Sequence, residues 1–260
     1  MRWGVVIAAG GEVEPELDAV LGVRRKAMAV IAGRTSLAHT LAAVEAADLG
    51  PCVTVTGVEI ASEVTYGTFV PEGASAVENA HLGLQVLGEH VQGVLFLPAD
   101  TPLLRAEDLV RFTETVLRRA DAEGKPHRWY ATGLSPSAEF ARVYPGVPFE
   151  SLRLREGPHL SGALYACSRD GLVHILELAT SIRRSRKNQM KMLWKLGLWN
   201  LVRYRAGRIS LSEAERILAQ ALGGAAWIDP NCHPSTCLDF DNPEDWQALL
   251  RLVENGNRPD

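Results

Sequence analysis

The residues that could carry chemistry stand at three distant points of the chain. Gly10 and Gly11 follow one apolar run, Asp100 follows another, and Asp239 and Asp241 stand near the C-terminus. Neighbouring glycines leave backbone N–H groups open to a ligand, and such groups form a concavity that binds anions. Carboxylates, together with substrate phosphates, are typical ligands of Mg²⁺. These residue types suit a metal-bound polyanion such as a nucleoside triphosphate.

Positive charge follows the glycine pair after an acidic stretch. Arg24, Arg25 and Lys26 come directly after GEVEPELDAVLGV. Their side chains could neutralise a polyanion lying over the glycines. Taken alone, the glycine pair is equally well explained as a tight turn after a first strand.

Asp100 lies in the segment FLPADTPLL, where an apolar run ends. The run Gly93 to Leu97 is wholly apolar and is the best candidate for a central strand. In open α/β sheets, ligands bind beyond the carboxyl ends of the strands. Asp100 could instead cap a helix beginning near Glu107, but the intervening Pro102 favours metal or phosphate chemistry.

The C-terminal acids lie in TCLDFDNPEDW. We predict a strand through DFD, which would place Asp239 and Asp241 on one face, where either could point at the same site as Asp100. Asp241 is nearer the carboxyl end. Because Asn242 and Pro243 precede a predicted helix, one of the acids could instead be a structural cap.

Strands alternate with helices along the first half of the chain. The predicted strands are Trp3 to Ala8, Pro51 to Val58, Gly67 to Pro71, Gly93 to Leu97 and Trp129 to Leu134. The predicted helices are one through Leu37, Leu41 and Val44, one over Ser75 to Leu87 and one over Ala106 to Ala120. Such βαβ units predict an α/β fold with a doubly wound, mostly parallel sheet.

The pattern changes after residue 134. Residues 135 to 165 contain four prolines and two strand-like segments, Ser151 to Arg155 and Ser161 to Cys167. We expect loops and added strands over the sheet edge, forming a wall for a second substrate. His159 is a candidate contact to that substrate, although a loop histidine is more often packed or solvated.

A basic segment interrupts an acidic protein. No Asp or Glu occurs between Glu177 and Glu213, whereas the stretch holds nine cations: Arg183, Arg184, Arg186, Lys187, Lys191, Lys195, Arg203, Arg205 and Arg208. The other 18 Lys and Arg face all 31 Asp and Glu, so the rest of the chain carries a charge of −13. Residues 182–208 could form a phosphate-rich acceptor site, a peripheral membrane contact, a dimer contact or a solvated helical face.

Composition excludes several classes of protein. The formal net charge of −4 gives no general case for a nucleic-acid partner. No apolar run is long enough to span a bilayer, and we expect no signal peptide. The four cysteines are too scattered for a disulfide scaffold, which favours the cytoplasm. Cys232, His233 and Cys237 do not match a closed zinc site.

Three motifs carry a resemblance to a known family. WGVVIAAGG with KAMAVIAGRTSLAHTL, then FLPADTPLL and DFDNPEDW, resemble the MobA-like nucleotidyltransferases, which include molybdenum cofactor guanylyltransferase. The likeness covers residues 2 to about 134 and 225 to 252. It implies the nucleotide-diphospho-sugar transferase variant of the Rossmann fold. It also implies a Mg²⁺-dependent nucleotidyltransferase of EC 2.7.7 type, which moves NMP from an NTP to a phosphorylated small-molecule or lipid-like acceptor and releases pyrophosphate.

The resemblance also implies roles for single residues. It gives nucleotide contacts at Ala8, Ala9, Gly10, Gly11 and Lys26, base or ribose contacts at Glu78 and Asn79, and metal ligands at Asp100 and Asp241. Lys26, Asp100 and Asp241 are the implied catalytic residues. The family has an arginine soon after the glycine pair, for which Arg24 or Arg25 could substitute here. If the acidic run 12–18 no longer supports transfer, the alternative is a catalytically weakened, nucleotide-binding regulatory module.

We expect four parts in the chain. Residues 1–134 would form the nucleotide-binding α/β core, and residues 135–170 the strands and loops on the acceptor side. Residues 171–222 would be a basic helical insertion. Residues 223–260 would supply a C-terminal strand and helix that complete the core.

Overall fold

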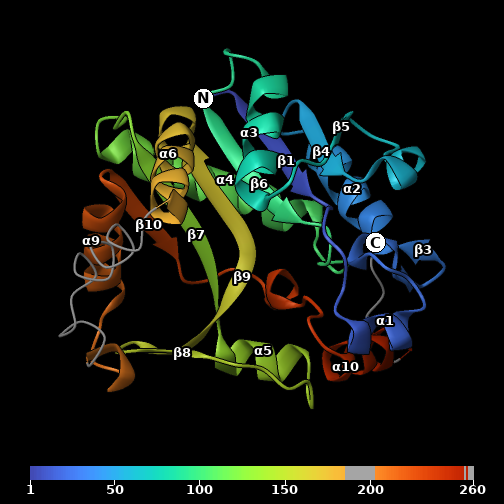
Figure 1. Ribbon diagram of the computed structural model, residues 1–260. Helices are drawn as coiled ribbons and strands as arrows, with labels where there is room; N and C mark the ends of the chain where they lie inside the picture. Colours follow the sequence, from blue (N-terminus) through green and yellow to red (C-terminus); the bar gives the residue numbers. More distant parts are fainter. Residues whose placement is uncertain (185–202, 255, 257–260) are drawn as a thin grey trace.

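The fold is built on an eight-stranded mixed sheet (Figure 1). The structure, a computed structural model, describes residues 1–184, 203–254 and 256. The strands of this sheet are β1 (Trp3–Ala8), β4 (Cys52–Thr56), β5 (Thr68–Pro71), β6 (Gly93–Pro98), β7 (Trp129–Pro136), β8 (Leu152–Leu154), β9 (Gly157–Ser168) and β10 (Ala225–Asp229). Their order is β10-β7-β9-β6-β1-β4-β5, with β8 paired to β9. A two-stranded sheet joins β2 (Val30–Ile31) to β3 (Arg34–Thr35).

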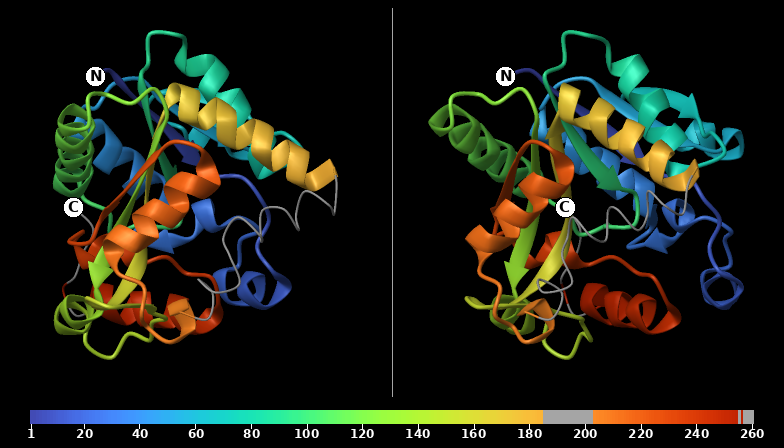
Figure 2. Two further views of the ribbon diagram at one scale, coloured as in Figure 1. Left: turned by 90° about the vertical axis from the view of Figure 1, so that its left-hand side faces the viewer. Right: turned by 60° about the vertical axis from the view of Figure 1, so that its left-hand side comes forward.

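Helices cover both faces of the sheet. The α-helices are α1 (Pro15–Leu21), α2 (Ser36–Ala47), α3 (Ala76–Leu87), α4 (Ala106–Ala122), α5 (Ser137–Val143), α6 (Arg169–Arg184), α9 (Leu211–Leu222) and α10 (Pro243–Glu254). Short 3₁₀ helices are η1 (Lys26–Met28), η2 (Val58–Glu63) and η3 (Pro234–Cys237). Figure 2 shows α2 and α4 on one side of the sheet and α3 and α6 on the other. The predicted doubly wound α/β fold is therefore confirmed.

The central strands are apolar because both of their faces are buried. In β1, Val5 and Ile7 belong to the core beneath α2 and α4, whereas Val6 belongs to the core beneath α3 and α6. In β6, Leu95 faces the first core and Val94 the second. A strand buried on two faces reads as a continuous hydrophobic run. The prediction of a central strand here is confirmed, since β6 lies between β1 and β9.

The position predicted for the segment Ser161 to Cys167 is wrong. It belongs to β9, which lies inside the sheet and pairs antiparallel with both β6 and β7. Large α/β sheets often carry an antiparallel strand among parallel ones. Because strand pairing joins segments that are distant in sequence, the order of the segments did not reveal that β9 lies between β6 and β7.

The strand predicted through DFD is also wrong. Residues 238–242 form an irregular segment outside the sheet. Phe240 is fully buried and packs on Trp246, with ring centroids 5.1 Å apart. The apolar signal in this segment thus comes from Leu238 and Phe240, two side chains buried in one core. Alternation along a strand cannot be used to orient Asp239 and Asp241.

Side chains cap the first turns of three helices. Thr35 and Ser75 cap α2 and α3, and Ser210 with Glu213 forms a capping box at α9. These caps satisfy N–H groups that have no partner inside the helix.

Much of the basic segment, residues 185–202, lies outside the described residues. Within the residues that are described, no helix is both long and apolar enough to cross a membrane.

One buried serine links α2 to the turn that carries Asp100. Ser36 Oγ donates a hydrogen bond of 2.7 Å to the carbonyl oxygen of Ala99. We predict that Ser36→Ala lowers the free energy of unfolding by about 1–2 kcal/mol, because the buried carbonyl loses a donor. Urea denaturation measures this value. Ser151→Ala, at an exposed position, is the control, and an equally small effect of both substitutions would contradict the prediction.

Candidate functional site

Three side chains from distant parts of the chain meet beyond the carboxyl ends of β1 and β6. Lys26 begins η1, Asp100 lies in the turn after β6, and Asp241 precedes α10. Lys26 Nζ lies 2.9 Å from Asp100 Oδ2 and also forms an ion pair with Asp241 Oδ1. The structure thus brings together the lysine and the two aspartates that the sequence singled out.

Hydrogen bonds fix the turn around Asp100. The Ala99 N–H donates to the Ala8 carbonyl at 3.0 Å, and the Ala99 carbonyl accepts from Ser36. The Oδ1 atom of Asp100 is buried and has no hydrogen-bond partner in the part of the chain that the structure describes. Helix α4 begins after Arg105 without a side-chain cap. Asp100 is therefore not a helix cap.

Asp241 is presented to solvent by a rigid segment. Its side chain is 71% exposed, whereas the preceding Phe240 is buried in the core. The start of α10 is capped by the next residue, because Asn242 Oδ1 accepts the Asp245 N–H at 2.9 Å. The Asp241 carboxylate is consequently not used up in capping the helix.

The charges of this cluster act on one another. Burial alone would lower the pKa of Lys26, but the carboxylates of Asp100 and Asp241 outweigh it and raise that pKa, so the amine is protonated at neutral pH. Partial burial, with the negative charges of Asp100 and Asp241, raises the pKa of Asp239 to about 6. Since Asp239 is itself an exposed residue, crowding of negative charge is the cause that an added cation would relieve.

The donors suit a divalent metal ion that arrives with phosphate. Carboxylate oxygens of Asp100 and Asp241 converge on one position, and the buried Oδ1 of Asp100 lacks a partner among the described residues. Mg²⁺ is commonly held by one or two carboxylates plus substrate phosphates. No group of three or more His, Cys, Asp or Glu in the described ranges could enclose a metal. The residues therefore fit a substrate-completed metal site.

The glycine loop is anchored to the neighbouring strand. The Ala9 N–H donates to Val55 O at 3.0 Å, and Thr56 Oγ1 donates to Ala9 O at 2.8 Å. Gly11 follows in the left-handed region, with φ of 86°, which a residue with a side chain rarely adopts. The loop is thus a turn whose backbone is held by hydrogen bonds to β4 and by the conformation of Gly11.

A carboxylate already faces this loop. Glu72 Oε2 accepts the Gly11 N–H at 2.9 Å, and a β-carbon at Gly10 would collide with the same oxygen. Arg25 pairs with Glu72 at 2.6 Å and with Glu59 at 2.5 Å. The hydrogen bond from Arg25 lowers the pKa of Glu72. Arg25, expected to be available for phosphate, is instead held between two acids.

Glu78 and Asn79 hold the loop before α3. Asn79 Oδ1 accepts the Gly73 N–H at 2.6 Å, and Glu78 Oε2 accepts the Ala74 N–H at 2.8 Å. Asn79 also borders Gly10. Both residues thus lie beside the glycine loop, where their side chains shape the backbone.

Sequence reasoning missed the two acids that hold Arg25. Glu72 stands directly after β5, and the rule that ligands lie beyond the carboxyl ends of strands could have identified it. Glu59 lies in η2 and carries no such signal. Its role is visible only in the fold.

Other candidates lie elsewhere. His159 is buried, with its Nδ1 atom 3.0 Å from Gly157 O, so the expected contact to an acceptor is replaced by packing inside the sheet. All four cysteines are free thiols. Burial raises the pKa of Cys237 to about 11, which keeps this thiol protonated at neutral pH.

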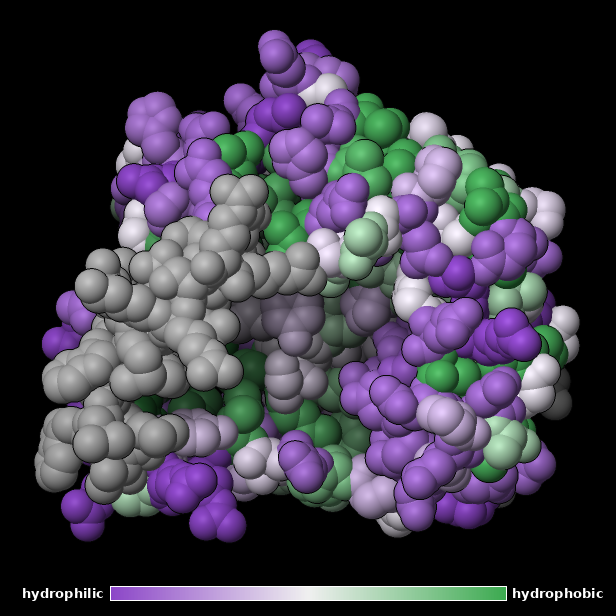
Figure 3. Space-filling model, in the orientation of Figure 1, coloured by the Kyte–Doolittle hydropathy of each residue, from purple (hydrophilic) through white to green (hydrophobic). Residues whose placement is uncertain are grey.

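A cavity opens beside Asp241. Its volume is about 580 Å³, and its lining includes Ser161. Five acids and no cation of the described residues also line it: Glu150, Asp239, Asp241, Glu244 and Asp245. The face seen in Figure 3 is hollowed near its middle. This cavity offers space for a substrate next to the ion-pair cluster.

Solved structures resemble the whole chain. A hypothetical transferase from Thermus thermophilus is 26% identical, with a TM-score of 0.74, and the match covers 94% of this chain and 99% of that one. CMP:2-keto-3-deoxy-manno-octonic acid synthetase complexed with CTP is 14% identical, with a TM-score of 0.56 and coverage of 98% and 99%. Mycobacterium tuberculosis Rv0371C in complex with manganese is 16% identical, with a TM-score of 0.51 and coverage of 96% and 99%.

These likenesses show the fold of nucleotide-diphospho-sugar transferases. No curated protein matches the chain in sequence. A family model described as the MobA-like NTP transferase domain matches residues 5–136 of the 260. That range contains the glycine loop, Lys26 and Asp100, which the structure gathers at one edge of the sheet. The chain therefore belongs to the MobA-like NTP transferase family and is a nucleotidyltransferase.

Proposed function

We propose that the protein is a Mg²⁺-dependent nucleotidyltransferase that transfers NMP from an NTP to a phosphorylated small-molecule or lipid-like acceptor and releases pyrophosphate. The observation that carries this proposal is the convergence of Lys26 with Asp100 and Asp241 next to the glycine loop. Membership of the family supports the transfer of a nucleotide. The manganese complex of Rv0371C supports the use of a divalent ion.

In this proposal, the triphosphate lies over the loop Ala8–Gly11, whose backbone N–H groups bind its oxygens. Asp100 and Asp241 hold Mg²⁺, which neutralises phosphate charge when bound. Lys26 moves from the carboxylates to the phosphates, since an ammonium on a flexible stem can exchange one anion for another. Glu78 and Asn79 lie at the side where the base or ribose would bind.

The reaction follows from this arrangement. A phosphate oxygen of the acceptor attacks the α-phosphorus in line, and the bond to pyrophosphate breaks. The acceptor binds in the cavity beside Asp241, next to the ion-pair cluster. Lys26 stabilises the charge that develops on the transferred group. The reaction requires no covalent nucleophile of the protein.

The proposal extends to the setting of the reaction. An NTP and the phosphorylated acceptor are its partners, without nucleic acid, and the reaction takes place in the cytoplasm. Residues 1–134 and 223–260 form the nucleotide-binding unit, and residues 135–170 the acceptor side. The basic residues 182–208, of which 185–202 lie outside the described residues, supply a peripheral membrane or dimer contact.

Removing either carboxylate tests the site. We predict that Asp100→Ala and Asp241→Ala each lower the rate of pyrophosphate release at least ~100-fold, because each removes a ligand that acts mainly in the transition state. The assay uses each of the four NTPs with a panel of phosphorylated acceptors. Glu107→Gln, an exposed acid on α4, is the control. Unchanged turnover in both alanine variants would overturn the site assignment.

Neutralising Glu72 tests whether its carboxylate competes with the triphosphate for the glycine loop. The Glu72 carboxylate accepts a hydrogen bond from the Gly11 N–H and would repel a triphosphate placed there. We predict that Glu72→Gln tightens NTP binding about fivefold, the equivalent of about 1 kcal/mol, because it removes a negative charge next to the triphosphate. Thermal-shift titration measures this, with Glu45→Gln, an exposed acid on α2, as the control. Weaker binding would show instead that Glu72 contacts the nucleotide itself.

A further inference from the structure

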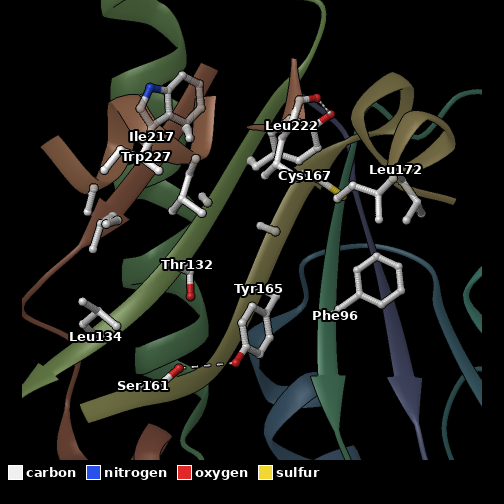
Figure 4. A pocket seen from close by; sticks show the side chains of 18 of the residues that line it. Phe96, Thr132, Leu134, Ser161, Tyr165, Cys167, Leu172, Ile217, Leu222 and Trp227 are labelled. Carbon is white, nitrogen blue, oxygen red and sulfur yellow. Dashed lines mark hydrogen bonds between the residues drawn. The ribbon is translucent and has the colours of Figure 1, made fainter. Parts of the chain in front are cut away.

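A larger cavity lies between the sheet and the helices α3, α6 and α9. Its volume is about 830 Å³, within the range of sites that bind small molecules. Figure 4 shows its floor, where Phe96, Tyr165 and Thr132 project from the neighbouring strands β6, β9 and β7. Leu172 of α6 and Ile217 of α9 border it on either side.

The lining of this cavity carries no charge among the described residues. Its few polar groups are largely engaged, since Tyr130 Oη donates to Leu222 O at 3.1 Å and Tyr165 Oη lies 3.4 Å from Ser161 Oγ. Tyr165 nevertheless leaves 48% of its surface exposed. Apolar surface gathered in such a hollow gains free energy when an apolar group covers it. A phosphate group would find no cation among the described lining residues of either cavity, but Lys26, which pairs with Asp241, is a cation next to the smaller one.

The cavity reaches the proposed catalytic site at two points. Phe96 stands four residues before Asp100 on β6 and the turn after it, a span of roughly 13 Å along an extended chain. Ser161 lines both this cavity and the smaller one that contains Asp241. A single molecule could therefore place one end among the aspartates and the other among uncharged side chains.

The cavity also extends to the helix beside the glycine loop. Ala76 and Val77 at the start of α3 line it, next to Glu78, which shapes the nucleotide-side loop. From β6 across β9 and β7 to β10 it spans three strand spacings, or roughly 14 Å. The cavity is thus longer than a bare phosphate or the phosphate ester of a small polar alcohol needs.

We propose that the acceptor is a phosphomonoester with an aliphatic chain, which places its phosphate beside Asp241 and its chain in the cavity between β9, α6 and α9. This inference rests on the proposed function and narrows its acceptor to one chemical class. The phosphate oxygen remains the nucleophile, and the aliphatic chain supplies binding energy and position. The charged part of the site thus binds the phosphate of the acceptor, and the uncharged cavity binds its aliphatic chain.

The test compares ethyl phosphate with decyl phosphate, each below its micelle concentration, as ligands of the full chain. Calorimetric titration is expected to show affinity rising about fourfold for each added methylene until the cavity is filled, because burial of one methylene contributes about 0.8 kcal/mol. A parallel thermal-shift titration with NTP and Mg²⁺ reports on the nucleotide site alone.

Two substitutions place a charge in the cavity. Ile217→Glu and Tyr165→Glu are expected to reduce the affinity for decyl phosphate at least ~10-fold while NTP still stabilises the protein. Tyr165 is half exposed, so its variant keeps the test open if Ile217→Glu does not fold. Gln220→Glu, an exposed position of α9 outside the lining, is the control and should bind both ligands as the unaltered chain does.

The outcomes separate this inference from the proposed function. Equal affinity for ethyl and decyl phosphate, or decyl phosphate binding that survives both cavity substitutions, would overturn the aliphatic acceptor even where NTP binds normally. Absence of NTP binding would overturn the proposed function, whatever the alkyl phosphates do. Dependence on chain length that is lost only in the cavity variants would support the inference.

Discussion

The ion pairs of Lys26 with Asp100 and Asp241 are the interaction on which the arrangement of the site depends. They join the segment after the glycine loop, the turn after the central strand and the segment before the last helix. Two carboxylates at one position repel each other unless a cation lies between them. Lys26 supplies that cation. A metal ion that arrives with phosphate would take over this role and free the lysine for the phosphates.

The glycine loop shows a parallel exchange of charge. Glu72 occupies the Gly11 N–H and pairs with Arg25, which also pairs with Glu59. In both halves of the site, charged groups therefore pair with partners from the chain itself. A bound Mg²⁺ and triphosphate would replace these partners. Nucleotide binding would then exchange one set of ion pairs for another at the carboxyl ends of the strands. This requires little movement of the strands.

The mixed sheet connects the nucleotide side to the acceptor side. Because β9 lies between β6 and β7, Tyr165 pairs with Phe96 of β6, the strand that precedes Asp100, and Ser161 pairs with Leu134 of β7. The two cavities meet at Ser161. Had β9 lain at the sheet edge, the apolar floor formed by Tyr165 and Phe96 would not exist. The position of one antiparallel strand thus determines the shape of the acceptor space.

Local patterns predicted the parallel strands and the convergence of Lys26 with the two aspartates. These features depend on hydrophobic runs and the rule for the carboxyl ends of strands. The place of β9 and the partners of Arg25 depend on contacts between distant segments, which a single sequence does not display. The segment 238–242 was predicted as a strand because buried Leu238 and Phe240 alternate with exposed Asp239 and Asp241, which is the pattern of a strand.

The most direct measurement of the central claim is a crystal structure with Mg²⁺ and an NTP analogue that cannot be cleaved at the α-phosphate. The account predicts Mg²⁺ about 2.1 Å from an oxygen of Asp100 and of Asp241. It also predicts the triphosphate over Gly10 and Gly11, with Lys26 Nζ on a phosphate oxygen. A metal ion bound away from both aspartates, or a triphosphate that leaves Lys26 paired with them, would contradict it.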